Sequence, residues 1–346
     1  MTAARRPVDI PIFPCLRDHR FAGRAVLPAV EAMQILAATL PADRTDLLPT
    51  RIRDARFDKF LFLPDEIDRI SAFHEIAEDS DGETVSRLMT RTTSAKGFSR
   101  IKEHVTLRWE RARHRHAPDA RRSGNGGNAG NDGSEIGAAN PGRGRNPALP
   151  SGSVGRGCAP APGCPRPFPA TEPPEMFIPS DRLYAEMVPF APAFHNLAGG
   201  VRLWPEGATA EVFAPDHPAF PGPLGSPFPL DAAFHAACAW SQRYAGIVAF
   251  PVGLAIRDVM EPTRPGERYR ATILRVRTDS DPSFPAGIST LEDSPASAVG
   301  KGPGETLAFD IHLTDDRDRL RESAFGVEMR DVSGGRLRPP SWVHGT

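Results

Sequence analysis

Apolar side chains recur at helical spacing in two stretches of the chain. In residues 27–40 this spacing predicts a helix, with Pro28 suited to its first turn. The apolar residues of this stretch are Val30, Met33, Ile35, Leu36 and Leu40. Residues 229–246, rich in Ala and containing Leu, Phe and Trp, predict a second long helix. The chain is therefore expected to contain two long apolar helices, one in each half.

Other stretches alternate apolar and polar residues, which is the pattern of a half-buried strand. The clearest one places Leu307, Phe309, Ile311 and Leu313 on one face. The predicted strands are residues 57–64, 83–93 and 101–109 in the first half, and 201–213, 268–278, 306–314 and 323–332 in the second. Each half thus combines one long helix with several strands, so that an antiparallel sheet can wrap around the helix. The pattern favours an internal duplication over two unrelated α+β domains.

Between the halves, residues 113–175 are rich in Gly, Asn, Ser and Pro and contain almost no large apolar side chains. Such a segment cannot bury enough surface to fold by itself. It predicts a linker or a disordered insertion. The expected organisation is an N-terminal unit at residues 1–112 and a C-terminal unit at residues 176–346.

The composition is that of a globular protein, with 40% hydrophobic and 25% charged residues among 346. A net charge of −1 gives no sign of a nucleic-acid partner or of an anionic membrane surface. No apolar run is long enough to span a membrane, and the N-terminal residues lack the apolar segment of a signal peptide. We therefore expect a cytoplasmic protein, with an enzyme as the first function class to consider.

The four cysteines are too few and too scattered for a disulfide framework. Cys158 and Cys164 lie close together, but no second Cys or His pair stands at zinc-binding spacing. Cys15 and Cys238 are isolated in the sequence. No metal site is expected.

His19, Gly23 and Pro28 form an H-x3-G-x4-P pattern directly before the first predicted helix. Histidine suits the removal of a proton because its ordinary pKa is about 6.5 and apolar surroundings keep it neutral. Gly23 leaves the backbone open, so that N–H groups of this turn can stabilise a developing oxyanion. A loop histidine at an ordinary turn fits the same three residues.

Asp231 and His235 are four positions apart on the second predicted helix, so their side chains lie on one face. Burial in an apolar site raises the pKa of a carboxyl group, which lets it hold a proton at neutral pH. We therefore expect Asp231 to act as an acid or proton relay, with His235 orienting it. A helix-capping aspartate and a core histidine fit the same spacing.

Together the two motifs resemble the dehydratase domain of modular polyketide synthases, and they are similar to the dehydratases of polyunsaturated fatty-acid synthases. His19, Gly23 and Pro28 match that family's H-x3-G-x4-P signature. Asp231 and His235 match its D-x3-Q/H signature. The resemblance extends over nearly the whole chain outside residues 113–175.

A third stretch, residues 183–197, resembles the family's Y-G-P-x-F region. Pro192 and Phe194 match that region, while Phe190 and Ala191 replace its tyrosine and glycine. The resemblance implies that Phe190, Pro192 and Phe194 line a substrate tunnel. Each of them would also be ordinary as a core residue.

The resemblance implies an α+β double hot-dog fold, with two antiparallel sheets each wrapped around a long central helix. It implies a dehydratase acting on a β-hydroxyacyl thioester, with His19 as general base and Asp231 as acid or proton relay. Gly23, Pro28 and His235 would support them. The family's substrate is carried on the phosphopantetheine of an acyl carrier protein. The expected partners are therefore that carrier and other synthase components, a homodimer is allowed, and no cofactor of the enzyme's own is expected.

Two other functions stay open at this point. A double hot-dog protein without turnover would bind acyl chains or scaffold a biosynthetic complex. An enoyl-thioester isomerase would use the same base as a dehydratase, and thioester hydrolysis is a further hot-dog reaction. The presence of both His19 and Asp231 favours the dehydratase.

Overall fold

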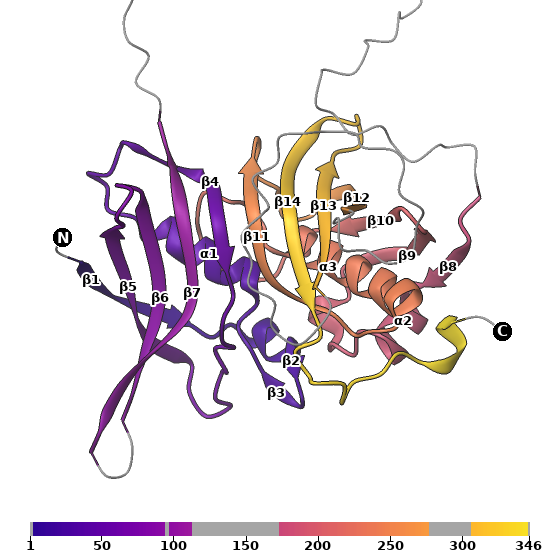
Figure 1. Cartoon of the computed structure of the whole chain (residues 1–346), viewed down its shortest axis with the longest axis horizontal. Helices are drawn as coiled ribbons and strands as arrows, with labels where there is room; N and C mark the ends of the chain where they lie inside the picture. Colours follow the sequence, from indigo (N-terminus) through magenta and orange to yellow (C-terminus); the bar gives the residue numbers. More distant parts are fainter. Residues whose placement is uncertain (1–2, 94–96, 113–172, 277–305, 345–346) are drawn as a thin grey trace, which may run out of the picture. The chain divides into compact units, whose positions relative to one another are not determined.

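The computed structural model describes residues 3–93, 97–112, 173–276 and 306–344 (Figure 1). The predicted linker at 113–175 lies outside this part of the chain except for its last three residues, so its predicted boundaries stay predictions. Within the described ranges, no helix combines the length and the apolar character needed to cross a membrane.

The first half contains one long helix and five strands of the main sheet. Helix α1 (Ala29–Ala38) is buried from Val30 to Ala37, because apolar residues occupy most of its circumference. It contacts strands β4, β6 and β7. The strands of this half are β1 (Ala4–Pro11), β4 (Leu47–Arg56), β5 (Arg69–Glu78), β6 (Thr84–Thr93) and β7 (Ser99–Arg111).

The second half repeats this plan with seven strands. Every residue of helix α3 (Phe228–Trp240) is buried, as expected for a helix that is apolar on all sides. It contacts β9 to β13. The strands are β8 (Met176–Pro179), β9 (Leu197–Trp204), β10 (Gly207–Phe213), β11 (Phe250–Val259), β12 (Arg268–Val276), β13 (Thr306–Thr314) and β14 (Leu320–Arg330).

Each half also contains short elements, and some of them carry residues of the candidate site. Before α1 come a 3-10 helix, η1 (Pro14–Asp18), and a small hairpin of β2 (Arg20–Phe21) and β3 (Arg24–Ala25). The second half adds α2 (Ser180–Glu186), the 3-10 helix η2 (Pro192–Phe194), a π-helical turn η3 (Ser241–Ala245) and the 3-10 helix η4 (Ser341–His344).

All twelve main strands form one antiparallel sheet, because β4 of the first half pairs with β11 of the second (Figure 1). The order is β1-β5-β6-β7-β4-β11-β14-β13-β12-β10-β9-β8. Gly253 permits this pairing, since a Cβ there would lie 2.8 Å from the carbonyl oxygen of Ala55. The prediction of two separate sheets is therefore wrong. β4 and β11 would each be an exposed edge strand of its own sheet, and here their backbone N–H and C=O groups hydrogen-bond to each other.

Both predicted helices are confirmed as α1 and α3, with the second ending in the π-helical turn η3. The predicted strands at 83–93, 101–109, 268–278, 306–314 and 323–332 correspond to β6, β7, β12, β13 and β14, and residues 201–213 form the β9–β10 hairpin. The strand predicted at 57–64 is wrong, because this segment makes only one isolated bridge, between Phe62 and Val26. Its phenylalanines pack instead on the β2–β3 hairpin, where the Phe60 and Phe21 rings lie 4.6 Å apart.

Candidate active site

His19 lies between η1 and β2, and the backbone of Val26 holds its ring. Its Nδ1 is 3.0 Å from the Val26 carbonyl oxygen, while the His19 carbonyl accepts the Val26 N–H at 2.8 Å. A carbonyl oxygen only accepts, so Nδ1 carries the proton and Nε2 of the neutral ring keeps its lone pair. Burial lowers the pKa of His19 below its ordinary 6.5, with the charge of Asp231 opposing this change. The ring is therefore neutral at physiological pH, with one free basic nitrogen.

Gly23 closes the hairpin that brings His19 and Val26 together. The turn residues Ala22 and Gly23 have φ angles of 49° and 79°, the left-handed conformation of a tight hairpin turn that favours glycine. Gly23 is exposed, and its predicted part in an oxyanion site stays a prediction. Pro28 directly precedes α1 instead of lying in its first turn, and its carbonyl accepts the Ala32 N–H at 3.0 Å.

Asp231 and His235 lie on one face of α3, as their spacing predicts. Both are almost fully buried, and Nε2 of His235 is 3.0 Å from Oδ2 of Asp231. Burial raises the pKa of Asp231, but the neighbouring His235 and the charge of His19 outweigh it, so that this pKa lies below its ordinary value. The expectation of a raised pKa for Asp231 is therefore wrong. The carboxylate and the imidazole thus form a close buried pair.

Tyr184 on α2 belongs to this network, although no motif marks it in the sequence. Its hydroxyl is 3.2 Å from Nδ1 of His235 and accepts the Leu197 N–H at 3.2 Å. Burial raises the pKa of Tyr184, so the phenol stays protonated. His195 stacks on the ring, with centroids 4.2 Å apart. A hydroxyl from α2 thus contacts His235, whereas position 190, where the resembling family has tyrosine, is Phe190.

Phe190 packs on both His19 and His235. Its ring centroid is 4.4 Å from that of His19 and 5.0 Å from that of His235. Phe194, which is fully buried, packs 5.0 Å from the His19 ring. Pro192 is exposed at the start of η2. The structure therefore brings His19, Asp231, His235, Phe190 and Phe194 together, while lining of a tunnel by Phe190, Pro192 and Phe194 stays a prediction.

Asp18 ties the Phe190 segment to the loop that carries His19. Its carbonyl accepts the N–H of Ala191 at 3.1 Å, and its Oδ2 accepts the N–H of Ala193 at 3.0 Å. These bonds join residues far apart in the chain. They hold the aromatic rings of the second half against the histidine of the first.

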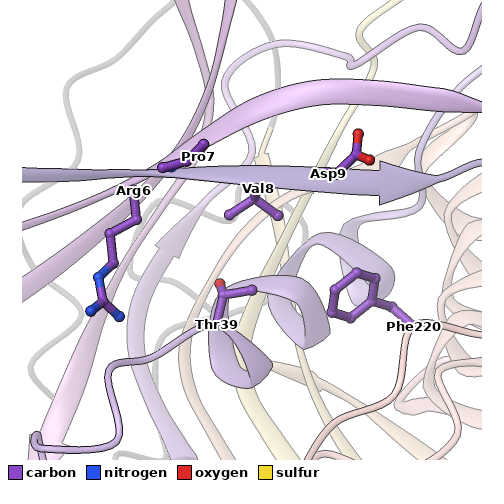
Figure 2. A pocket seen from close by; sticks show the side chains of 6 residues that line it. All are labelled: Arg6, Pro7, Val8, Asp9, Thr39 and Phe220. Atoms are coloured by element: carbon purple, nitrogen blue, oxygen red, sulfur yellow. The ribbon is translucent and has the colours of Figure 1, made fainter.

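In the described part of the chain, no group of three or more His, Cys, Asp or Glu side chains is placed to hold a metal ion. Cys15 and Cys238 are buried free thiols, and Cys158 and Cys164 lie outside the described residues. A hollow of about 460 Å³ lies between β1, Thr39 and Phe220 (Figure 2). Arg6 and Val8 point from β1 toward Thr39 in that view. None of the predicted site residues lines this hollow.

No protein-family model matches this chain, and no curated protein matches its sequence. Solved structures do share its fold. The dehydratase domain of a mycocerosic acid synthase-like polyketide synthase is 15% identical over 95% of this chain and 91% of its own, with a TM-score of 0.58. A trans-AT polyketide synthase dehydratase domain from Brevibacillus brevis is 13% identical over 95% of this chain and 93% of its own, with a TM-score of 0.54.

The dehydratase domain from the CurF module of curacin polyketide synthase is 12% identical over 94% of this chain and 93% of its own, with a TM-score of 0.56. At such identities the likeness shows the fold alone. The resemblance inferred from the motifs is thus confirmed at the level of fold: the chain folds like the dehydratase domains of polyketide synthases.

Proposed function

We propose that this protein is a dehydratase that removes water from a β-hydroxyacyl thioester on an acyl carrier protein, giving the α,β-unsaturated thioester, in polyketide or fatty-acid-like biosynthesis. One observation carries the proposal. His19, with a free Nε2, and His235, the partner of the buried Asp231, both pack on one aromatic ring, Phe190, in the fold of known dehydratases.

In the proposed reaction, Nε2 of His19 takes a proton from Cα of the substrate. The electron pair of that C–H bond forms the Cα=Cβ bond, and the Cβ–O bond breaks with its electrons moving to oxygen. The departing oxygen takes a proton from the Asp231–His235 pair, which in the reactive state holds one proton more than a carboxylate and a neutral imidazole, and leaves as water. His19 ends with one proton more and the pair with one fewer, so exchange with solvent restores both.

The surrounding groups support this division of roles. The Val26 carbonyl accepts the Nδ1 proton of His19 and so stabilises the imidazolium that forms. The proton destined for the leaving oxygen is shared with His235, since the pKa of Asp231 is low in this setting. Tyr184 fixes the other ring nitrogen of His235. His235 and Tyr184 are thus positioning residues for Asp231.

The proposal includes the partners that the resemblance implies. The acyl chain would arrive on the phosphopantetheine of a carrier protein, as part of the substrate, and the reaction needs no cofactor of the enzyme's own. Other synthase components would supply the β-hydroxyacyl group and use the product. A homodimer is compatible with this function.

The test is incubation with a 3-hydroxyacyl carrier protein or pantetheine thioester, followed by mass spectrometry for loss of water. His19→Ala and Asp231→Asn should each lower the rate by about 10²- to 10⁴-fold, because each removes a proton-transfer group. The exposed residues Asp216 and His344 provide matched controls, and Asp216→Asn and His344→Ala should keep the wild-type rate. Full activity of the His19 or the Asp231 variant would refute the assignment.

An enoyl-thioester isomerase is the second candidate, favoured by the ionised state of Asp231, since a carboxylate can shuttle a proton between two carbons. A 3-enoyl thioester supplied as substrate separates the two functions. Conversion to the 2-enoyl thioester without any dehydration of the 3-hydroxyacyl thioester would identify an isomerase. Tight binding of both thioesters with no conversion of either would identify an acyl-binding protein.

A further inference from the structure

Three side chains of the first half make polar contacts with one segment of the second half, residues 218–225. The Sγ of Cys15 contacts the Pro218 carbonyl oxygen at 3.3 Å. Oε1 of Glu31 accepts the Phe220 N–H at 2.7 Å. One helical turn further along α1, Gln34 accepts the Leu224 N–H at 3.0 Å and donates to the Gly225 carbonyl at 2.9 Å. The segment has no regular secondary structure, so these contacts determine its path.

This segment leads directly into the helix that carries Asp231. Gly225 is followed by Ser226 and Pro227, and α3 begins at Phe228. Ser226 is fixed in turn by its N–H to the Thr263 carbonyl at 3.0 Å. Because α1 starts ten residues after His19 in the chain and holds the entry to α3, it connects the placement of Asp231 with that of His19.

Glu31 is unusual among these contacts because it is a carboxyl group with 1% of its surface exposed. Its Oε1 has the Phe220 N–H, but its Oε2 has no hydrogen-bond partner. The charge of Asp231 on α3 acts on it unfavourably, because it opposes a second buried carboxylate. Within the described ranges, no cationic side chain forms an ion pair with it.

A buried carboxyl group in such surroundings keeps its proton. Burial raises the pKa of Glu31 to about 7, the Phe220 N–H opposes this rise, and the charge of Asp231 adds to it. Glu31 and Asp231 therefore divide their roles at neutral pH. Asp231 is ionised beside His235, whereas about half of the Glu31 side chains still carry their proton at pH 7.

We propose that Glu31 is a positioning residue that, in its protonated form, holds the entry to α3 against α1 and so sets the position of Asp231 relative to His19. This proposal rests on the proposed dehydratase function for its catalytic consequence, but its structural part stands apart from it. When Glu31 ionises, the Phe220 N–H still has its acceptor, but a buried negative charge without a cationic partner is added near that of Asp231, which destabilises the packing of α1 against α3.

Two variants separate the shape of this side chain from its charge. Glu31→Gln keeps an acceptor oxygen for the Phe220 N–H and resembles the protonated acid, but it cannot ionise. Glu31→Ala removes the acceptor of the Phe220 N–H altogether. Glu66→Gln, at an exposed loop position, makes the same charge change away from the site and serves as the control.

The activity profile against pH gives the first readout. At pH 6, Glu31→Gln should have a kcat/KM within about twofold of the wild type, and Glu31→Ala should be lower by about tenfold or more, because a misplaced group reacts slowly. At pH 8, Glu31→Gln should exceed the wild type by about tenfold, since most wild-type molecules then carry the ionised side chain. Glu66→Gln should follow the wild type throughout.

The melting temperature gives a second readout that needs no activity. The pKa of Glu31 in the folded protein, about 7, lies above its ordinary value of 4.5. The stability contributed by its proton is therefore complete below about pH 4.5 and is lost as the pH rises to about 7. Between these pH values the melting temperature of the wild type should fall relative to that of Glu31→Gln. The difference between Glu66→Gln and the wild type should stay constant.

These outcomes separate the two proposals. If the wild type dehydrates no thioester, the proposed function fails, while the melting curves still decide the role of Glu31. If Glu31→Gln follows the wild type in its melting temperature at every pH, or if Glu31→Ala is as active as the wild type, the role of Glu31 is overturned.

Discussion

His19 and Asp231 reach one site by different structural means. His19 is half-buried on a loop, and main-chain atoms of Val26 and a two-residue hairpin turn hold it. Asp231 is buried in a central helix, and its surroundings are side chains: His235 at 3.0 Å, and behind it Tyr184. Backbone conformation therefore positions His19, the proposed base, whereas specific side chains position Asp231, the proposed acid. Substitutions should distinguish these two kinds of support.

The largest effect is expected where a buried charge loses its partner. His235→Leu leaves Asp231 buried without the imidazole that lowers its pKa. The free energy of unfolding at pH 7 should fall by about 3 kcal/mol or more, as measured by urea denaturation. His235→Gln keeps an N–H donor for the carboxylate and should lose less than half as much. Equal stability of the Leu variant and the wild type would show that side chains do not hold Asp231.

On the histidine side, the sensitive position is a backbone turn. Gly23→Ala places a side chain at a φ of 79°, where it costs about 1 kcal/mol of stability and shifts the hairpin that holds His19. The rate of dehydration should fall by about tenfold or more, measured as kcat at saturating thioester. Gly334→Ala carries similar strain at a φ of 66° on an exposed loop after β14. Gly334→Ala should lower the free energy of unfolding by a similar amount and leave kcat unchanged. Equal losses of kcat in both variants would contradict the proposed role of the turn.

The smallest effect is expected at the outer end of the side-chain network. Tyr184→Phe removes the hydroxyl next to His235 and leaves the ring stacked on His195. Stability should fall by about 1 kcal/mol and kcat by only a few-fold, because His235 still contacts Asp231. Tyr244→Phe loses a hydroxyl contact with Glu175 outside the site and is the matched control. A change in the pH profile of activity with Tyr184→Phe alone would identify the network as the cause.

The two apolar helices could be predicted because the helical spacing of apolar residues is visible within a short stretch of sequence. α1, α3 and the pairing of Asp231 with His235 follow from that periodicity. Strand β4, with three arginines in LLPTRIRDAR, does not show a clean alternation, since its stability depends on strands far away in the sequence. The apolar segment at 57–64 gives the opposite error: Phe60 and Phe62 pack on the β2–β3 hairpin, and the segment forms a single isolated bridge in place of a strand.

The protonation states were harder to predict than the positions. Burial alone predicts a raised pKa for Asp231, and only the close approach of His235 reverses it. Glu31 carries the raised pKa instead. A single acidic residue in an otherwise apolar helix, AVEAMQILAA, was the signal that could have marked it. Tyr184 had no comparable signal, because its contact with His235 comes from the packing of α2 and not from sequence spacing.

The β4–β11 junction has a consequence for how the chain folds during synthesis. β4 leaves the ribosome nearly two hundred residues before its partner, since Arg56 pairs with Gly253. Throughout that interval its outer edge has no native strand to pair with, and contacts between such distant segments form slowly. The growing chain must therefore keep this edge from pairing with other chains until β11 is made. The final sheet, and with it the arrangement of His19 and Asp231, is completed late in folding.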